Sequence, residues 1–148
     1  MAKFSTGMRD AMIDGSSAKA LLTGCVMRIY EAPAAPADAD AAETGTLLMV
    51  LSAGGTGAGF SFDAVTGEAA LVRAAAQVWK TDAIGANGTM GYFRMVAPTD
   101  DGAQSTSAVR VQGTVGTAAG ADMMVSNADV VAGGPWILNY FRLTLPTA

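Results

Sequence analysis

Apolar and polar residues alternate with a period of two in the second half of the chain, the pattern of a strand that buries one face. Between 109 and 115, valines at 109, 111 and 115 share one face, and Arg110, Gln112 and Thr114 share the other. Gly113 within this run indicates a bulge or a close neighbour. The run 136–145 closes with the same alternation. Both runs predict half-buried antiparallel strands.

Shorter apolar runs, separated by turn residues, predict the remaining strands. A first strand covers Val26 to Glu31, and the uninterrupted apolar run from Thr46 to Ser52 predicts a strand buried on both faces. The stretch 69–79 fits either a helix or a strand. Further strands are expected at 60–62, at 91–96 after an Asn87-Gly88 hairpin turn, near 122–126 and at 136–145.

The first 24 residues differ from the rest because they carry helix signals. Ser5 or Thr6 can cap a helical segment that runs to Ile13, and Ser16 or Ser17 can cap a second one that runs to Leu22, each followed by a glycine. We therefore predict an all-β fold, an antiparallel β-sandwich or jelly-roll-like domain over 25–148, with a short helical N-terminal arm over 1–24.

The amino-acid composition indicates a hydrophobic core with few large side chains. The chain has 148 residues, among them 30 alanines and 18 glycines, so much of its 51% hydrophobic content is small side chains. Such a domain gains stability from neighbours that bury additional surface, and the exposed edges of a sandwich need protection. Both features predict a homo-oligomer, with a trimer as one arrangement.

Catalytic chemistry has few candidates in this sequence. There is no histidine, and Cys25 is the single cysteine, which we interpret as a small buried residue. An enzyme would depend on carboxylates such as the pairs Asp38 with Asp40 and Asp100 with Asp101. Adjacent acids usually lie on a solvated turn, so we predict a protein that is not an enzyme and binds no cofactor.

Two low-complexity segments are predicted to be loops that bind neither metal nor phosphate. The acidic segment 31–43, with Pro33 and Pro36, is predicted to be a solvated surface loop. Its acids partly match a calcium loop but lack the turn glycine and the terminal bidentate acid, so no metal is expected. The glycine-rich segment 53–59 fits neither phosphate-binding pattern and is predicted to be a flexible connection.

Charge limits the partners. The formal net charge is -4, and the nine basic residues are scattered singly, so the chain has no basic stripe for nucleic acid. The longest uncharged stretch, 44–62, is interrupted by glycines and is not a membrane helix. Arg9 and Asp10 stand where a signal peptide would be apolar. We expect a protein that is made in the cytoplasm and binds neither nucleic acid nor membrane.

Stretches over nearly the whole chain carry a family resemblance: Phe4 to Met12, Arg28 to Tyr30, Pro36 to Ala42, Thr44 to Leu48, Gly91 to Arg94, Asp100 to Gly102, Val109 to Gly116 and Phe141 to Pro146. In these stretches the chain resembles a family of small structural proteins of tailed bacteriophages, encoded among the head and tail genes. The resemblance implies a virion component. Glu31 and the additional acids depart from the family pattern, which leaves open whether the acidic loop makes contacts.

Three hypotheses follow. The first is a capsid decoration, or cement, protein that binds the major capsid protein in the virion through an N-terminal arm, residues 2–14, and stabilises the filled head by multivalent contacts. The second is a tail or neck component, such as a tail-tip, fibre or receptor-binding subunit. The third is a carboxylate enzyme. For the first, the candidate partner-binding residues are Lys3, Phe4, Met8, Arg9 and Met12.

Overall fold

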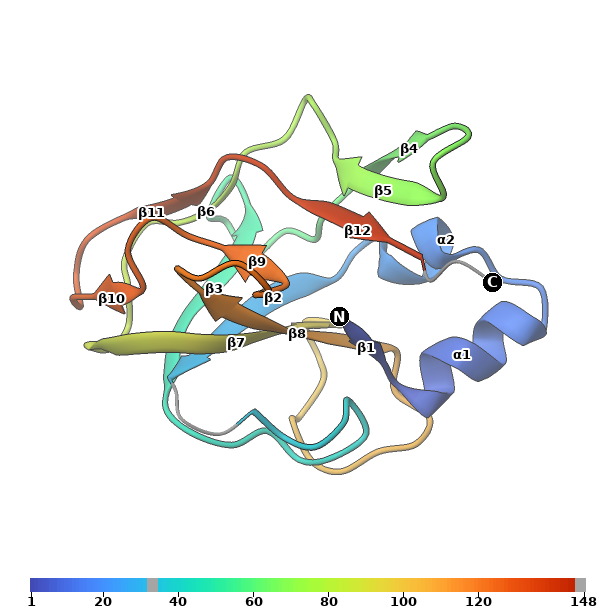
Figure 1. Cartoon of the computed structure of the whole chain (residues 1–148), viewed down its shortest axis with the longest axis horizontal. Coiled ribbons are helices and arrows are strands. Elements are labelled where there is room, and N and C mark those ends of the chain that lie inside the picture. Colours follow the sequence, from blue (N-terminus) through green and yellow to red (C-terminus); the bar gives the residue numbers. More distant parts are fainter. Residues whose placement is uncertain (32–34, 146–148) are drawn as a thin grey trace.

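Antiparallel strands make up most of the regular secondary structure in this computed structural model, which describes residues 1–31 and 35–145 (Figure 1). The predicted acidic loop includes 32–34, and the predicted domain includes 146–148, and both of these segments lie outside the described residues. The strands are β1 (Lys3–Phe4), β2 (Val26–Glu31), β3 (Leu47–Ala53), β4 (Phe62–Val65), β5 (Ala70–Arg73), β6 (Trp79–Thr81), β7 (Gly88–Val96), β8 (Arg110–Gly116), β9 (Met123–Met124), β10 (Asp129–Val130), β11 (Trp136–Leu138) and β12 (Arg142–Thr144).

These strands form a large sheet and a small one. The large sheet has the order β1-β8-β7-β2-β3-β6-β11, with β10 beside β7 and β9 beside β8, and the small sheet has the order β12-β5-β4. All pairings are antiparallel except that of β8 with β9. The predicted all-β antiparallel fold with a short helical N-terminal segment is therefore confirmed.

An aromatic cluster joins the two sheets. Trp79 of β6, with its side chain fully buried, stacks on Phe60 and meets Phe62 of β4 edge-on, with ring centroids 5.2 Å apart in the second pair. Phe141, just before β12, contacts both Trp79 and Phe93 of β7. Large rings compensate for the many alanines, because each buries far more apolar area than a methyl group.

Helix formation at the N-terminus follows the predicted caps. Helix α1 (Thr6–Ile13) begins after Ser5, whose hydroxyl accepts a hydrogen bond from the backbone N–H of Met8, and α2 (Ala18–Leu22) begins after Ser17 in the same way. Met8, Ala18 and Leu22 belong to the same buried hydrophobic cluster as the strands. The predicted arm, 1–24, thus shares its core with the predicted domain.

The prediction of a hairpin at Asn87-Gly88 is wrong. β6 and β7, which flank it, do not pair with each other, and β2 and β3 lie between them in the sheet. Gly88 lies at the start of β7, where an added Cβ would come within 2.9 Å of the Leu48 side chain, so this glycine permits close packing. Asn87 accepts a hydrogen bond from the backbone of Ala132.

Two other strand predictions need correction. The run 136–145 is broken into β11 and β12, which belong to different sheets, because the chain crosses between the layers at 139–141. In β3, Leu47 and Val50 are 41% and 39% exposed, so this strand is not buried on both faces. The stretch 69–79, left open between helix and strand, contains β5 and the start of β6.

Gly113 shows the predicted close neighbour. It pairs with Phe93 in the continuous register of β7 with β8, and an added Cβ would lie 2.6 Å from the Phe93 ring. Cys25 is buried, as interpreted from the sequence. Burial, with a smaller contribution from Asp100, raises the pKa of its thiol to about 11, so it stays protonated at neutral pH.

Candidate partner-binding surface

The N-terminus of α1 is fixed to the sheet by Ser5. Its hydroxyl donates to the carbonyl oxygen of Ala108 at 2.7 Å and accepts from the N–H groups of Met8 and Arg110 at 3.2 and 3.0 Å. These three bonds use the full capacity of a hydroxyl group. The backbone N–H of Ser5 also donates to the carbonyl oxygen of Arg110. One residue therefore both starts the helix and sets its position against β8.

Asp40 fixes the same helix end from the other side. Its two carboxylate oxygens accept from the N–H and the hydroxyl of Thr6 at 2.8 and 2.6 Å. The Thr6 hydroxyl bond is the largest cause of a lowered pKa at Asp40. Next to Thr6, Gly7 lies so close to the backbone of Ser107 that a Cβ would be 2.3 Å from the Ser107 oxygen. The position of α1 is thus fixed by long-range contacts.

The five predicted partner-binding residues divide into three environments. Met8 is fully buried and contributes to the core. Lys3 is exposed, and its ammonium group donates to the carbonyl oxygen of Ala37 at 2.6 Å. Arg9 is exposed, whereas Phe4 and Met12 are half-buried and pack against the core. Partner binding by these residues stays a prediction, and in this structure the buried side chain of Met8 is not accessible to a partner.

Three of the five residues line one groove. Phe4, Arg9 and Met12 meet Ile13 and Leu145 around an open hollow of about 510 Å³ between α1 and the end of the described chain. Ile13 is 85% exposed, a large apolar side chain left in water at the end of α1. The groove combines apolar walls with one cationic side chain, which suits an apolar protein segment with an acidic residue.

On β8, Arg110 and Gln112 of the predicted polar face are buried and Thr114 is exposed, so the prediction of a solvated polar face is correct only at Thr114. Residues 35–46, here called the strap, and the β7–β8 loop, residues 97–109, cover the buried polar residues. Arg94 and Gln112 are 0% and 2% exposed. The Arg94 guanidinium donates to the carbonyl oxygens of Ala41 and Asp38 at 2.8 and 3.2 Å. Burial is the main cause of a lowered pKa at Arg94.

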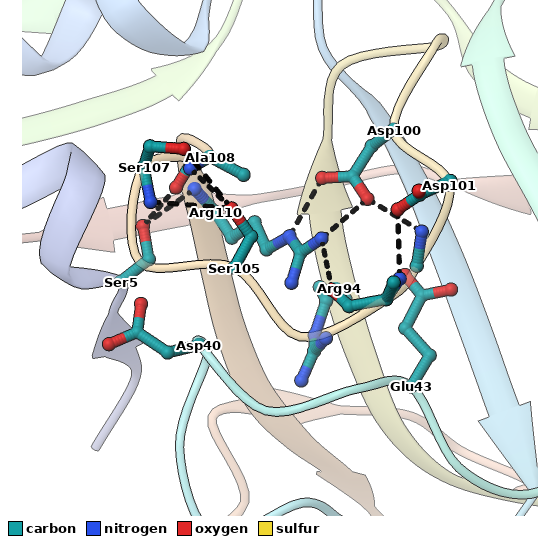
Figure 2. Close-up of polar contacts among 12 residues, drawn as sticks. Ser5, Asp40, Glu43, Arg94, Asp100, Asp101, Ser105, Ser107, Ala108 and Arg110 are labelled. Carbon is teal, nitrogen blue, oxygen red and sulfur yellow. Dashed lines mark hydrogen bonds and ion pairs between the residues drawn. The ribbon is translucent and has the colours of Figure 1, made fainter.

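A buried ion pair fastens the β7–β8 loop (Figure 2). Both carboxylate oxygens of Asp100 accept from the Arg110 guanidinium at 2.7 Å, and the two side chains are 5% and 1% exposed. Burial alone would raise the pKa of Asp100, but the bonds from Arg110 and from the Gly102 N–H lower it overall. The hydrogen bonds to Asp100 raise the pKa of Arg110. This bidentate geometry is the strong form of an ion pair.

Glu43 fixes the far end of the strap. It accepts from Arg28 at 3.1 Å and from the hydroxyl of Tyr30, and the Tyr92 hydroxyl bonds to the backbone of Thr44. Burial, followed by the bond to Glu43, raises the pKa of Tyr30. The prediction of a solvated acidic loop is therefore wrong at Asp40 and Glu43, whose carboxylates bind other parts of the molecule, whereas Asp38 is exposed.

The carboxylate pairs that were candidates for catalysis serve local structure. Asp38 accepts from the backbone N–H groups of Asp40 and Ala41, and Asp101 accepts from that of Ala103. Asp40 and Asp100 are occupied by Thr6 and Arg110. Among residues 1–31 and 35–145, no group of three or more metal-ligating side chains is placed to hold an ion. In the same described ranges, no helix is long and apolar enough to cross a membrane.

Comparison with known proteins gives no relative: no family model, no curated protein and no solved structure matches this chain. The surface must therefore be interpreted from its own chemistry. Sequence reasoning missed Ile13 and Leu145 as members of the groove. The exposed end of a capped helix could have indicated Ile13, but nothing local connects it with Leu145.

Proposed function

We propose that this protein is a non-enzymatic structural component of a tailed-phage virion, a capsid decoration protein that binds the major capsid protein as a homo-oligomer. The protein is made in the host cytoplasm and ends in the virion. The resemblance of the sequence to small tailed-phage structural proteins supports the class. The groove formed by Phe4, Arg9, Met12 and Ile13 supports binding through the N-terminal helix.

The groove carries this proposal because Ile13 is exposed beside the half-buried Phe4 and Met12, while Ser5 and Asp40 already have hydrogen-bond partners. Ile13 contributes apolar surface that is free for a partner. Asp40 and Ser5 hold α1 in place, so binding requires little ordering of the helix. A preorganised surface loses less conformational entropy on association. Modest affinity per copy is sufficient on a capsid lattice, because an oligomer binds several sites at once.

Binding to particles tests the groove. The variant Ile13→Lys places a charge in the apolar wall at an exposed position, so the fold is kept while binding to capsids that lack the protein falls at least tenfold. Val131→Lys is the matched control, since Val131 is 72% exposed and lies outside the groove. Co-sedimentation with the capsids measures both. Equal binding of Ile13→Lys and wild type would overturn the role of the groove.

Copy number tests the position in the virion. A decoration protein is expected in hundreds of copies per particle, and its removal by mild heating should leave intact tails and leaking heads. Quantitative mass spectrometry of purified virions measures the copy number. A handful of copies, with intact heads and failed adsorption after removal, would contradict decoration and favour the alternative, a tail or neck subunit.

A further inference from the structure

A chain of hydrogen bonds orients Arg9, the one charged residue among the five described residues that line the groove. A guanidinium nitrogen of Arg9 donates to the Thr6 hydroxyl at 3.1 Å, and this hydroxyl donates to the Asp40 carboxylate at 2.6 Å. An ionised carboxylate can only accept, so the hydroxyl hydrogen of Thr6 is committed to Asp40 and its oxygen is left to accept from Arg9. Asp40 therefore sets the direction of the bond that holds Arg9.

The positive charge of Arg9 has no acidic partner of its own. Among the described residues Arg9 forms no salt bridge, and both oxygens of Asp40 already bond to Thr6. The exposed acids Asp10 and Asp14, in α1 and directly after it, do not line the groove. A guanidinium group has five N–H donors, so most of the hydrogen-bonding capacity of Arg9 is available to a ligand.

This charge lies next to the apolar wall of the groove. Met12 and Ile13 follow Arg9 by three and four positions in α1, so the three side chains are neighbours on one face of the helix. Phe4 and Leu145 complete the wall. A guanidinium group binds a carboxylate through two parallel hydrogen bonds, which is its strongest pairing. The ligand that complements both parts of the groove therefore has a carboxylate beside an apolar group.

From this arrangement we infer that Arg9 determines the specificity of the groove, and that it selects a protein segment in which an Asp or Glu side chain lies next to an apolar one. The inference rests on the proposed function, since the segment would then belong to the capsid protein. Thr6 and Asp40 are positioning residues that act through Arg9. A segment with a lysine or a neutral residue in place of the acid binds more weakly, because it lacks the complementary charge.

Small probes test the charge selectivity without a capsid. Hexanoate and 1-hexanol have carbon chains of the same length, and only hexanoate carries a carboxylate. In an NMR titration followed at the methyl groups of Met12 and Ile13, the wild type should bind hexanoate about threefold more tightly than 1-hexanol, as expected for one exposed ion pair. Arg9→Gln should lose this preference. Lys19→Gln is the matched control, because it removes an exposed cation outside the groove and should keep the preference.

Two results of this titration would overturn the inference. The first is a wild type that binds the two probes equally or does not bind hexanoate. The second is an Arg9→Gln variant that keeps the preference for hexanoate. Circular dichroism checks that each variant is folded.

Thr6 variants test the positioning role. Thr6→Val removes the hydroxyl group and should reduce the preference for hexanoate, whereas Thr6→Ser keeps a hydroxyl group and should retain the preference. Binding of 1-hexanol reports on the apolar wall alone, so a merely structural role of Thr6 would weaken both probes equally. An equal loss for both probes, or the same preference in the two variants, would contradict the positioning role.

Capsid binding separates this inference from the proposed function. Arg9→Gln should weaken co-sedimentation with capsids that lack the protein by about threefold, and its binding should depend less on salt than that of the wild type. Capsid binding by Arg9→Gln equal to that of the wild type would overturn the inference and leave the proposed function standing. A wild type that does not bind capsids but prefers hexanoate would contradict the proposed function and leave the charge selectivity of the groove standing.

Discussion

Arg94 and Gln112 lie directly opposite each other on β7 and β8, and together they hold the strap on the sheet. The Gln112 side-chain oxygen accepts from two guanidinium nitrogens of Arg94, and its amide nitrogen donates to the carbonyl oxygen of Pro36 at 2.8 Å. Arg94 has no salt bridge within the described residues. A buried positive charge is thus solvated by neutral oxygens, which is tolerable only while each stays in place.

Replacing Gln112 by alanine should destabilise the protein. The change removes an acceptor from the buried Arg94 and a donor from Pro36, and unsatisfied buried groups of this kind cost about 1–3 kcal/mol each. Urea unfolding at neutral pH measures the loss. Gln104→Ala is the control, since Gln104 is exposed in the β7–β8 loop and should change stability by less than about 0.5 kcal/mol. Equal stability of the two variants would contradict the role of Gln112.

The ion pair between Asp100 and Arg110 predicts both a stability loss and a pH dependence. Asp100→Asn leaves a buried guanidinium without its counter-charge, which should cost about 3–5 kcal/mol. In the wild type, the folded-state pKa of Asp100 lies below its unfolded value, and the same holds for Asp40 and Asp122. A depressed carboxyl pKa contributes stability above the unfolded value and loses it as pH falls through the folded value.

Urea midpoints from pH 7 down to pH 3 measure this dependence. Between neutral pH and about pH 5, these three carboxyl groups should have little effect on the free energy of unfolding. At pH values lower than about 4 the free energy of unfolding should decrease, because these carboxyls take up protons in the unfolded chain before they do so in the folded one. Asp100→Asn should show a shallower fall, because one of the three groups is removed. An equally steep fall in the variant would show that Asp100 is not one of the groups responsible.

Gly7→Ala should destabilise α1, contrary to helix propensity. Within a helix, alanine usually stabilises by up to about 1 kcal/mol over glycine. Here the added Cβ would lie 2.3 Å from a backbone oxygen of Ser107, so the helix must move away from the β7–β8 loop. We expect a net loss of about 1–3 kcal/mol in thermal or urea unfolding. Gly134→Ala, where a Cβ meets nothing within 4 Å, should be near neutral.

Local signals in the sequence were sufficient for much of the fold. Ser5 and Ser17 cap helices because their hydroxyl groups act within three residues, and β2 covers the predicted range 26–31 because its β-favouring residues are consecutive. Such interactions depend on neighbours in the sequence, so a pattern of a few residues is enough to predict them.

The polar layer could not be predicted because its contacts are distant in sequence. Arg94 bonds to Ala41, 53 positions away, and Ser5 bonds to Ala108, 103 positions away. In β8, alternation correctly separated Arg110 and Gln112 from the valines, but alternation does not show whether the polar face meets water or another segment. The acids of the strap led to the prediction of a solvated loop for the same reason. The groove likewise depends on Leu145 reaching α1.

The way in which the strap is held has a consequence for how this chain can evolve. Gln112, Arg94 and Lys3 bind carbonyl oxygens of the strap, which every type of residue carries. The identities of most exposed residues between them are therefore nearly free to change, while Asp38, Asp40 and Glu43 are fixed because they act through their side chains. We expect natural variants to diversify along the strap and to keep these three acids, so that new surface chemistry arises without a change of fold.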